Sequence, residues 1–210
     1  MSSNQHWDRA YTARDATALT WFEATPEASI RLVRQCMHAG GALVDIGGGS
    51  SALVDHCLDE GIGPVTVLDL SAEALAITRA RLGNRADSAN LIVGDVRDWT
   101  PDRSYDLWHD RAAFHFLTDM EDRQRYLHTL DAALRAGGVA IIATFASTGP
   151  STCSGLQVQR YAPSELADTL EELAPGLLAP VQSELLAHQT PKGAVQDFQI
   201  SVFRKKEQTS

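Results

Sequence analysis

The chain has 210 residues, and its 27 acidic and 18 basic side chains give a formal net charge of −9. This length suits one domain with a sizeable core, and the acidic balance excludes a broad basic surface for nucleic acid or anionic membranes. No apolar run is long enough to cross a bilayer, and residues 1–8 lack the basic start and apolar core of a signal peptide. We therefore expect a cytoplasmic protein, monomeric by default, with neither a nucleic-acid nor a membrane partner.

Most of the chain alternates helical and strand patterns. Residues 4–18 read as a short helix with a linker after it, and a second helix begins near Pro26 and ends at Gly40-Gly41. Short apolar runs predict five strands, at Ala42–Ile46, Val65–Asp69, Asn90–Gly94, Tyr105–His109 and Val139–Phe145. Helices are predicted between them, at Ser51–Glu60, from Ser71 to Leu82, and from Met120 to about Leu134, with Gly137-Gly138 as the stop of the last one.

Strands that alternate with helices across short loops predict a parallel, doubly wound α/β sheet. The end of the chain differs: a helix is expected at Leu166–Leu173, and two strands follow at Val181–Ala187 and Gln196–Phe203. Because no helix separates these two strands, they can form an antiparallel hairpin at the sheet edge. Residues 205–210 read as a polar tail.

A glycine turn follows the first predicted strand, in the sequence Leu-Val-Asp-Ile-Gly-Gly-Gly-Ser-Ser-Ala-Leu from Leu43. Glycine allows a sharp turn and leaves no side chain between the backbone and a ligand. A strand, a glycine turn and a helix N-terminus together cradle nucleotides. Asp69 follows Gly49 by 20 residues, where a ribose-binding carboxylate is expected. The pattern predicts an adenosine-containing ligand, and Gly47, Gly49 and Ala52 leave a dinucleotide formally open.

Two further acids favour a ligand with an amine over a dinucleotide. Asp45 precedes the glycine turn and can reach a ligand ammonium, whereas it would repel the diphosphate of NAD. Asp95 follows the third predicted strand, where it can accept a hydrogen bond from an adenine amino group. Acids at strand ends are also common turn and cap residues, but three at successive strand ends are harder to explain in that way.

This order of motifs resembles the class I S-adenosylmethionine-dependent methyltransferases over roughly residues 25–204. The resemblance implies a Rossmann-like sheet of seven strands with an antiparallel last strand, and S-adenosylmethionine as cofactor. It implies that Gly47 and Gly49 approach the methionine part, that Asp69 holds the ribose and that Asp95 with Val96 holds adenine. Ser50 and Leu70 belong to the same implied cofactor set, with Asp45 at the amine.

The N-terminal segment, residues 1–24, is predicted to form a helical lid. Trp7 and Tyr11 are four residues apart and share a helix face, and Trp21 follows beside Phe22. This pattern looks like the lid of a bacterial methyltransferase group related to thiopurine methyltransferases and to small protein-lysine methyltransferases. Aromatic rings attract a sulfonium cation, so Trp7, Tyr11 and Trp21 are predicted to contact the cofactor. Alternatively, these rings only fix the helix to the core.

The segment after the fourth predicted strand is expected to face the transferred methyl group. It contains His109, Asp110, Arg111 and His115, and it is similar to a Trp-x-Asp-Arg-Gly pattern of the thiopurine-type enzymes, with Ala112 in place of the glycine. Asp110 and Arg111 could pair and shape the pocket, and either histidine could act as a base near neutral pH. Histidines in such places are more often structural.

A polar loop, residues 146–155, is predicted to form a second lid beside the acceptor. Its Cys153 could contact substrate or could be an incidental thiol, and Tyr161 and His188 are expected to line the same opening. Cys36 and Cys57 lie in helical patterns and are expected to be buried and inert. The cysteines are odd in number and have no metal-ligand spacing, so no metal is predicted.

The sequence thus predicts a methyltransferase that acts by in-line displacement on a small nucleophile. The thiopurine-type resemblance favours a thiol or another chalcogen as acceptor, since a thiolate needs little base catalysis. A protein-lysine methyltransferase remains the alternative, and would need an acidic pocket to deprotonate an ammonium whose reference pKa is about 10.4. An NAD(P)-dependent oxidoreductase or a non-catalytic nucleotide sensor is the least favoured class.

Overall fold

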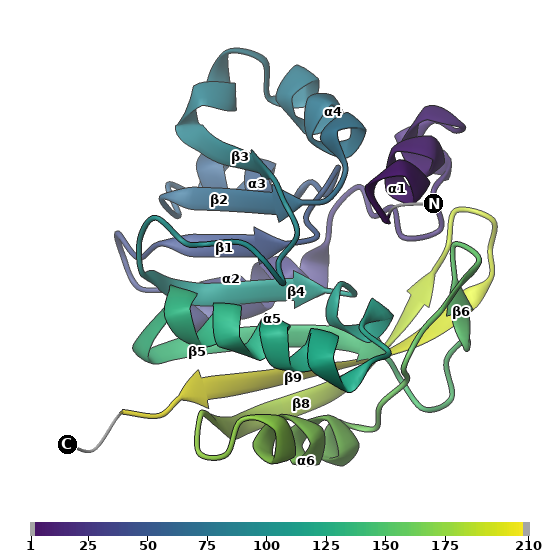
Figure 1. Cartoon of the computed structure of the whole chain (residues 1–210). Coiled ribbons are helices and arrows are strands. Elements are labelled where there is room, and N and C mark those ends of the chain that lie inside the picture. The colour runs from purple at the N-terminus through teal and green to yellow at the C-terminus, as the bar shows by residue number, and fades with distance from the viewer. Residues whose placement is uncertain (1–2, 208–210) are drawn as a thin grey trace.

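The computed structural model describes residues 3–207, which form one sheet with helices on both faces (Figure 1). The strands of this sheet are β1 (Leu43–Ile46), β2 (Val65–Asp69), β3 (Ala89–Val93), β4 (Tyr105–Arg111), β5 (Leu134–Phe145), β8 (Leu178–Gln189) and β9 (Val195–Lys205). Their order is β3-β2-β1-β4-β5-β9-β8. Strands β1 to β5 pair in parallel, whereas β9 is antiparallel to β5 and β8. The predicted mostly parallel, doubly wound sheet is therefore confirmed, as is its late antiparallel hairpin.

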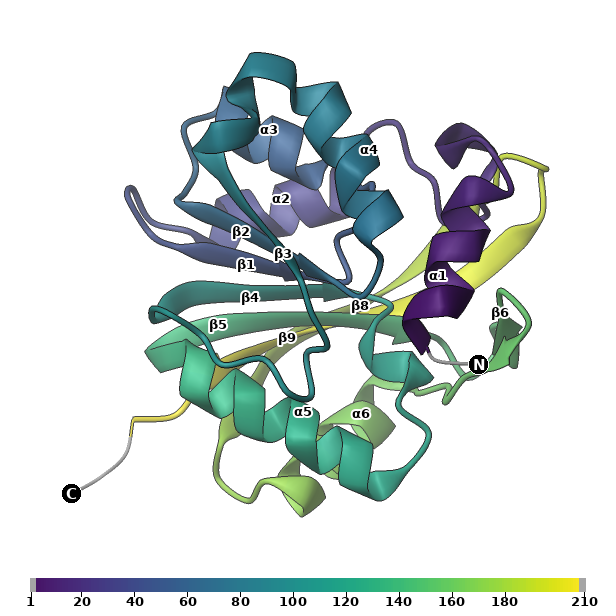
Figure 2. The ribbon, with the colours of Figure 1, turned by 45° about the horizontal axis from the view of Figure 1, so that its top comes forward.

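The helices are α1 (Ser3–Thr12), α2 (Glu27–Cys36), α3 (Leu53–Asp59), α4 (Ala72–Leu82), α5 (Met120–Ala133) and α6 (Pro163–Leu173). Three short 3₁₀ turns accompany them, η1 (Ala16–Ala18), η2 (Gly83–Ser88) and η3 (Phe114–Phe116), and a small hairpin consists of β6 (Thr152–Cys153) and β7 (Leu156–Gln157). Figure 2 shows α2, α3 and α4 on one face of the sheet and α5 and α6 on the other. In the described residues, no helix has the length and apolar character of a membrane span.

Alternating side chains of the central strands supply two cores, one on each face. In β1, Val44 and Ile46 pack with the α5 and α6 side, and Leu43 packs with the α2, α3 and α4 side. All four residues of β1 are buried, as expected for a central parallel strand covered on both faces. The apolar interior fixes the strand register, and the register brings the carboxyl ends of β1, β2 and β4 to one edge.

The structure differs from the predictions at the second half of the sheet. The glycines Gly137-Gly138 do not end α5, because that helix already ends at Ala133 and the chain continues directly into β5. They lie inside β5, where pairing with β4 shifts register and Gly137 has φ +74°. Lys205, the first residue of the predicted tail, is instead the buried end of β9, and its ammonium donates to the carbonyl of Leu134 at 2.8 Å.

Helix α1 lies across the carboxyl edge of the sheet, beside the ends of β1 and β2 (Figure 1). It is attached there by Asp8, whose carboxylate accepts a hydrogen bond from the Ser71 hydroxyl at 2.7 Å. Ser71 is the predicted N-cap of α4, and its oxygen accepts from the backbone N–H of Ala74 at 3.1 Å. A carboxylate at a helix N-terminus is favourable, so this contact holds the lid segment over the edge where the glycine turn lies.

Candidate active site

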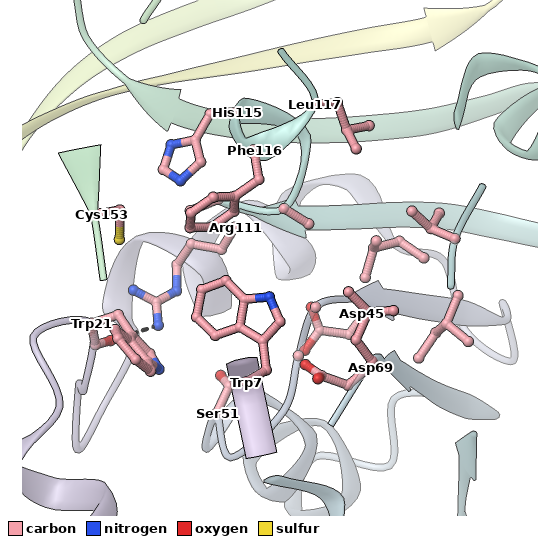
Figure 3. Close-up of a pocket in the computed structure, with 18 of the residues that line it drawn as sticks. Trp7, Trp21, Asp45, Ser51, Asp69, Arg111, His115, Phe116, Leu117 and Cys153 are labelled. Carbon is pink, nitrogen blue, oxygen red and sulfur yellow. Dashed lines mark hydrogen bonds between the residues drawn. The ribbon is translucent and has the colours of Figure 1, made fainter. Parts of the chain in front are cut away.

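A cavity of about 440 Å³ lies at the carboxyl edge of the sheet, beneath α1 (Figure 3). This edge is where the strand order reverses between β1 and β4, the usual ligand position in doubly wound sheets. The volume falls in the range of small-molecule sites. Predicted site residues that line it are Trp7, Tyr11, Trp21, Asp45, Gly47, Ser50, Asp69, Leu70, Asp95, Val96, His109, Arg111, His115 and Cys153.

The glycine turn forms the floor of this cavity. Gly47 and Gly49 have φ values of +64° and +43°, which glycine adopts without steric cost. A Cβ atom on Gly49 would lie 2.8 Å from the Tyr11 hydroxyl and 2.9 Å from a carboxylate oxygen of Asp69. Gly49 itself does not line the cavity, but its lack of a side chain lets Tyr11 and Asp69 approach the turn.

Asp45 lies in β1 beside the turn, and its carboxylate forms a hydrogen bond with His109 of β4. Its Oδ1 lies 2.7 Å from Nδ1 of His109, and Nε2 of His109 lies 2.9 Å from the Ser29 hydroxyl. All three side chains are buried. With both ring nitrogens engaged, His109 can orient the carboxylate, and this arrangement differs from the predicted role of His109 as a base.

Asp69 lies at the end of β2, where its Oδ1 accepts from the backbone N–H of Ser71 at 2.8 Å. Burial raises the pKa of Asp69 to about 7, with a contribution from the nearby negative charge of Asp45. Two carboxylates facing one cavity disfavour each other's charge. A ligand that donates hydroxyl hydrogens to Asp69 and an ammonium to Asp45 would relieve this repulsion.

Asp95, which follows β3, is engaged by a neighbouring cation. The Arg97 guanidinium donates to both carboxylate oxygens, with Nε at 2.9 Å from Oδ1 and 3.1 Å from Oδ2. Although burial opposes ionisation, the hydrogen bonds from Arg97 leave the pKa of Asp95 below its ordinary value. Asp95 is therefore an ionised acceptor on the cavity wall, next to Val96.

The predicted lid aromatics converge on the cavity. The Trp7 ring contacts the rings of Trp21 and Phe116 edge-on, with centroids 5.9 and 5.0 Å apart. The Tyr11 hydroxyl accepts from the indole N–H of Trp21 at 3.2 Å. Tyr11 and Trp21 also pack against Ala74 of α4. The geometry therefore accommodates both alternatives, a ring wall facing the cavity and attachment of the lid to the core.

The end of β4 and the following turn supply Arg111 and His115 to the opposite wall, near Cys153 (Figure 3). Arg111 donates to the backbone carbonyl of Trp21 at 2.8 Å and lies 3.7 Å from the Glu23 carboxylate. Its partner is thus Glu23, not the predicted Asp110. Ala112 has φ +76°, so it keeps the left-handed conformation that a glycine would adopt there without strain. Burial raises the pKa of Cys153 to about 11, which makes it a neutral thiol.

Besides Gly49, three predicted site residues lie outside the cavity. Asp110 is fully buried and accepts from the Ala113 and Phe114 backbone N–H groups, at 2.7 and 3.0 Å, and from the Tyr126 hydroxyl, at 2.7 Å. Burial raises its pKa to about 6. Its bonds fix the turn after β4, and the geometry gives no support to a catalytic role.

Tyr161 and His188 were expected at the opening but point elsewhere. Tyr161 is buried in the core with α5 and α6, and its hydroxyl accepts from Arg123 at 3.2 Å. His188 of β8 binds Glu23 at 2.9 Å and the carbonyl of Thr20 at 2.8 Å. The hydrogen bond to Glu23 raises the pKa of His188. His188 therefore attaches the linker after α1 to the hairpin of β8 and β9, and it lines a small void separate from the main cavity.

Several cavity residues were not predicted from the sequence, among them Glu23, Phe116, Leu117, Phe145, Gln157, Gln196 and Phe198. Phe145, the last residue of β5, pairs with Phe198 of β9, so the position of both rings depends on long-range strand pairing. Glu23 follows the Trp-Phe pair in the sequence, and that proximity was the one available signal. Within residues 3–207, no cluster of three or more His, Cys, Asp or Glu side chains could hold a metal.

Comparison with known proteins gives partial sequence matches and whole-chain structural ones. Residues 43–138, just under half of the chain, match a family model described as a methyltransferase domain. A malonyl-[acyl-carrier protein] O-methyltransferase of Ilyobacter polytropus is 26% identical over 81 residues, 39% of this chain and 30% of that protein. The chain thus matches less than a third of the length of this curated relative.

Two solved structures are similar over nearly the whole chain. One comes from work on the conversion of a disulfide bond into a thioacetal group during echinomycin biosynthesis; its TM-score is 0.78 at 20% identity, covering 98% of this chain and 94% of that one. The other is a Burkholderia thailandensis 1,6-didemethyltoxoflavin-N1-methyltransferase with 1,6-didemethyltoxoflavin and S-adenosylhomocysteine bound. Its TM-score is 0.74 at 20% identity, covering 99% and 92% of the two chains. These likenesses establish a shared fold.

Proposed function

We propose that this chain is a class I S-adenosylmethionine-dependent methyltransferase, which binds S-adenosylmethionine in the cavity and transfers the methyl group to a small nucleophilic molecule. One observation carries the proposal. Asp45, Asp69 and Asp95, from the ends of three consecutive strands, line one cavity around a glycine turn. An adenosyl amino acid offers a matching donor to each carboxylate: an ammonium, a ribose diol and an adenine amino group.

The proposed cofactor position follows from this match. Asp45 accepts from the ammonium, and its contact with His109 holds the carboxylate in place. Asp69 accepts from the ribose hydroxyls, and Asp95 with Val96 contacts adenine. The sulfonium then faces the lid, where the ring of Trp7 offers a favourable surface for a cation.

Methyl transfer requires the nucleophile and the sulfur to lie on opposite sides of the methyl carbon. The protein contributes alignment and exclusion of water, which lower the barrier without covalent participation. The aromatic side chains of α1, β5 and β9 enclose the remaining part of the cavity and supply that exclusion. No residue of this wall is required to remove a proton from an acceptor that is already anionic.

The charges of the cavity favour a small acceptor over a lysine side chain. A lysine-modifying site needs a free carboxylate to take up the ammonium. Beyond the three proposed cofactor ligands, the acceptor side holds Glu23, and Glu23 is paired with Arg111 and His188. The aromatic wall that remains suits an apolar, planar molecule.

A thiol or other chalcogen is the favoured acceptor atom. The support is the resemblance to thiopurine-type enzymes and the low demand of a thiolate for base catalysis. The similar proteins span several acceptors, since their names describe O-methylation, N-methylation and chemistry at a disulfide. The acceptor is therefore set by the lid and the late hairpin, where such folds differ from one another.

The test is formation of S-adenosylhomocysteine with a panel of aromatic thiols, selenols, phenols and heterocyclic amines. We expect turnover with one or more thiols or selenols and none in a Gly47→Arg control, whose side chain would enter the cavity floor. Turnover restricted to phenols or amines would contradict the assignment of sulfur or selenium as the acceptor atom. Transfer of label only to a protein would replace the proposal with protein methylation.

A further inference from the structure

His115 presents a buried polar atom that has no partner among the described residues. It lies in η3, is 0% exposed, and its Nε2 makes no hydrogen bond. The ring lines the cavity, and Figure 3 shows it extending towards the space between Cys153 and Phe116. A buried donor or acceptor without a partner costs free energy, so a ligand group that reaches this atom and pairs with it would recover that cost.

The proton of this imidazole can be assigned from its other nitrogen. The backbone N–H of Phe145 donates to Nδ1 of His115 at 3.3 Å. Nδ1 therefore carries the lone pair, and in the neutral ring the proton must be on Nε2. Burial lowers the pKa of His115 to about 3, so the ring stays neutral across the physiological range. The unpartnered Nε2 is thus an N–H donor and cannot act as the base that the sequence suggested.

The surroundings of this donor are aromatic. The His115 ring contacts the rings of Phe116 and Phe145 at centroid distances of 4.5 and 4.8 Å. The Phe145 ring in turn contacts Phe198 at a centroid distance of 4.8 Å, and the Phe116 ring contacts Trp7 at 5.0 Å. A continuous run of rings therefore extends from the lid to the hairpin, with one neutral donor in its middle.

We propose that His115 determines acceptor specificity, its Nε2–H binding a lone-pair atom of a planar aromatic acceptor that lies against this run of rings. The inference rests on the proposed function and adds a substrate class: an aromatic or heteroaromatic molecule that carries a ring nitrogen or carbonyl oxygen near its reacting atom. Nearby Arg111 does not supply the same contact freely, because Glu23 and the Trp21 carbonyl engage its guanidinium.

The test compares two flat probes that differ by one atom, quinoline and naphthalene, titrated calorimetrically into the protein saturated with S-adenosylhomocysteine. Only quinoline offers a lone pair to Nε2–H. We expect wild type to bind quinoline about tenfold more tightly, the effect of one buried hydrogen bond. His115→Phe should lose this preference, and His128→Phe, a matched change at an exposed position of α5, should keep it. Equal binding of the probes by wild type, or an unchanged preference in His115→Phe, would overturn the proposal.

Two further measurements keep the proposal testable if His115→Phe does not fold. His115→Gln retains an N–H donor and should keep part of the preference for quinoline. In ¹⁵N-histidine spectra of the wild type, His115 should stay neutral with its proton on Nε2 from about pH 6 to pH 8. A proton on Nδ1, or titration in that range, would contradict the assignment. Failure to bind S-adenosylhomocysteine at all would reject the proposed function itself, whereas binding without a preference for quinoline rejects only this inference.

Discussion

Nδ1 of His109 lies 2.7 Å from Oδ1 of Asp45, and both side chains are buried beside the glycine turn. The two residues face each other across paired strands, since Asp45 of β1 is in register with His109 of β4. The sheet therefore fixes the direction of the carboxylate that we assign to the cofactor ammonium. Several measurable consequences depend on this arrangement.

Removing the charge of Asp45 should weaken only ligands that carry an amino acid group. We expect Asp45→Asn to lower affinity for S-adenosylmethionine at least tenfold, the usual effect of losing a charge-assisted hydrogen bond. Binding of 5′-methylthioadenosine, which lacks the ammonium, should be nearly unchanged. His109→Leu should show the same ligand pattern with a smaller loss. Equal weakening of both ligands by Asp45→Asn would place the ammonium elsewhere.

Asp69 should make stability depend on pH in the ligand-free protein. Its pKa is raised from 3.8 to about 7, so the folded state holds a proton that the unfolded state has already lost. Stability from this group is present below about pH 4 and is lost as pH rises towards 7. Asp69→Asn should therefore have a free energy of unfolding larger than that of wild type by on the order of 2 kcal/mol at about pH 8, seen as a higher melting temperature, and the difference should vanish near pH 4. A lower melting temperature of the variant at pH 8 would contradict the burial of this charge.

The same substitution should have the opposite effect on the cofactor complex. An ionised Asp69 accepts hydrogen bonds from both ribose hydroxyls, whereas an amide offers a single acceptor oxygen. S-adenosylmethionine should bind about tenfold more weakly to Asp69→Asn, and wild-type affinity should fall as pH drops below 7. If Asp69→Asn were more stable than wild type and bound S-adenosylmethionine with the same affinity, Asp69 would not be the ribose ligand.

The sequence predicted the polar half of the site because the positions of these acids are set by local order along the chain. Asp45, Asp69 and Asp95 each lie at or just beyond the carboxyl end of a strand, and parallel strands bring these ends to one edge. The second half depends on packing between distant segments. Asp110 has the residue type of a catalytic acid, but its place in β4 directs its side chain into the core, where it accepts from Tyr126.

The last part of the chain also contains side chains whose contacts depend on packing between distant segments and could not be predicted from the sequence. We expected His188 and Tyr161 at the opening from their position in the sequence, but His188 instead binds Glu23, and Tyr161 is buried in the core and binds Arg123. Lys205 looked like the start of a polar tail, yet its long apolar stem can be buried while its ammonium reaches carbonyl oxygens. The hydrophobic periodicity of the sequence predicts where a helix or strand lies, but it does not predict which residue a long side chain will contact.

Gly49 offers a steric test of the cradle with a matched control. Gly49 and Gly61 both have positive φ, +43° and +66°, so alanine strains the backbone at either site. Only at Gly49 would the new Cβ meet other atoms, those of Tyr11 and Asp69, while Gly61 faces open space. Both variants should lose about 1 kcal/mol of stability from strain, but only Gly49→Ala should lose cofactor binding. Equal affinities in a titration with S-adenosylhomocysteine would contradict the close approach.

Trp7 should distinguish the charged cofactor from its neutral product. If its ring faces the sulfonium, Trp7→Leu should weaken S-adenosylmethionine about tenfold more than S-adenosylhomocysteine, in line with a desolvated cation–π contact. Trp7→Phe should retain part of the difference. Parallel losses for the two ligands would leave Trp7 with only a role in attaching the lid.

The most direct test of the account is calorimetric titration of the purified protein with S-adenosylmethionine, S-adenosylhomocysteine and NADH. We predict micromolar binding of both adenosyl ligands, strong weakening of both by Asp69→Ala in a folded protein, and no binding of NADH. Binding of NADH without the adenosyl ligands would contradict the account and make the glycine turn a dinucleotide site.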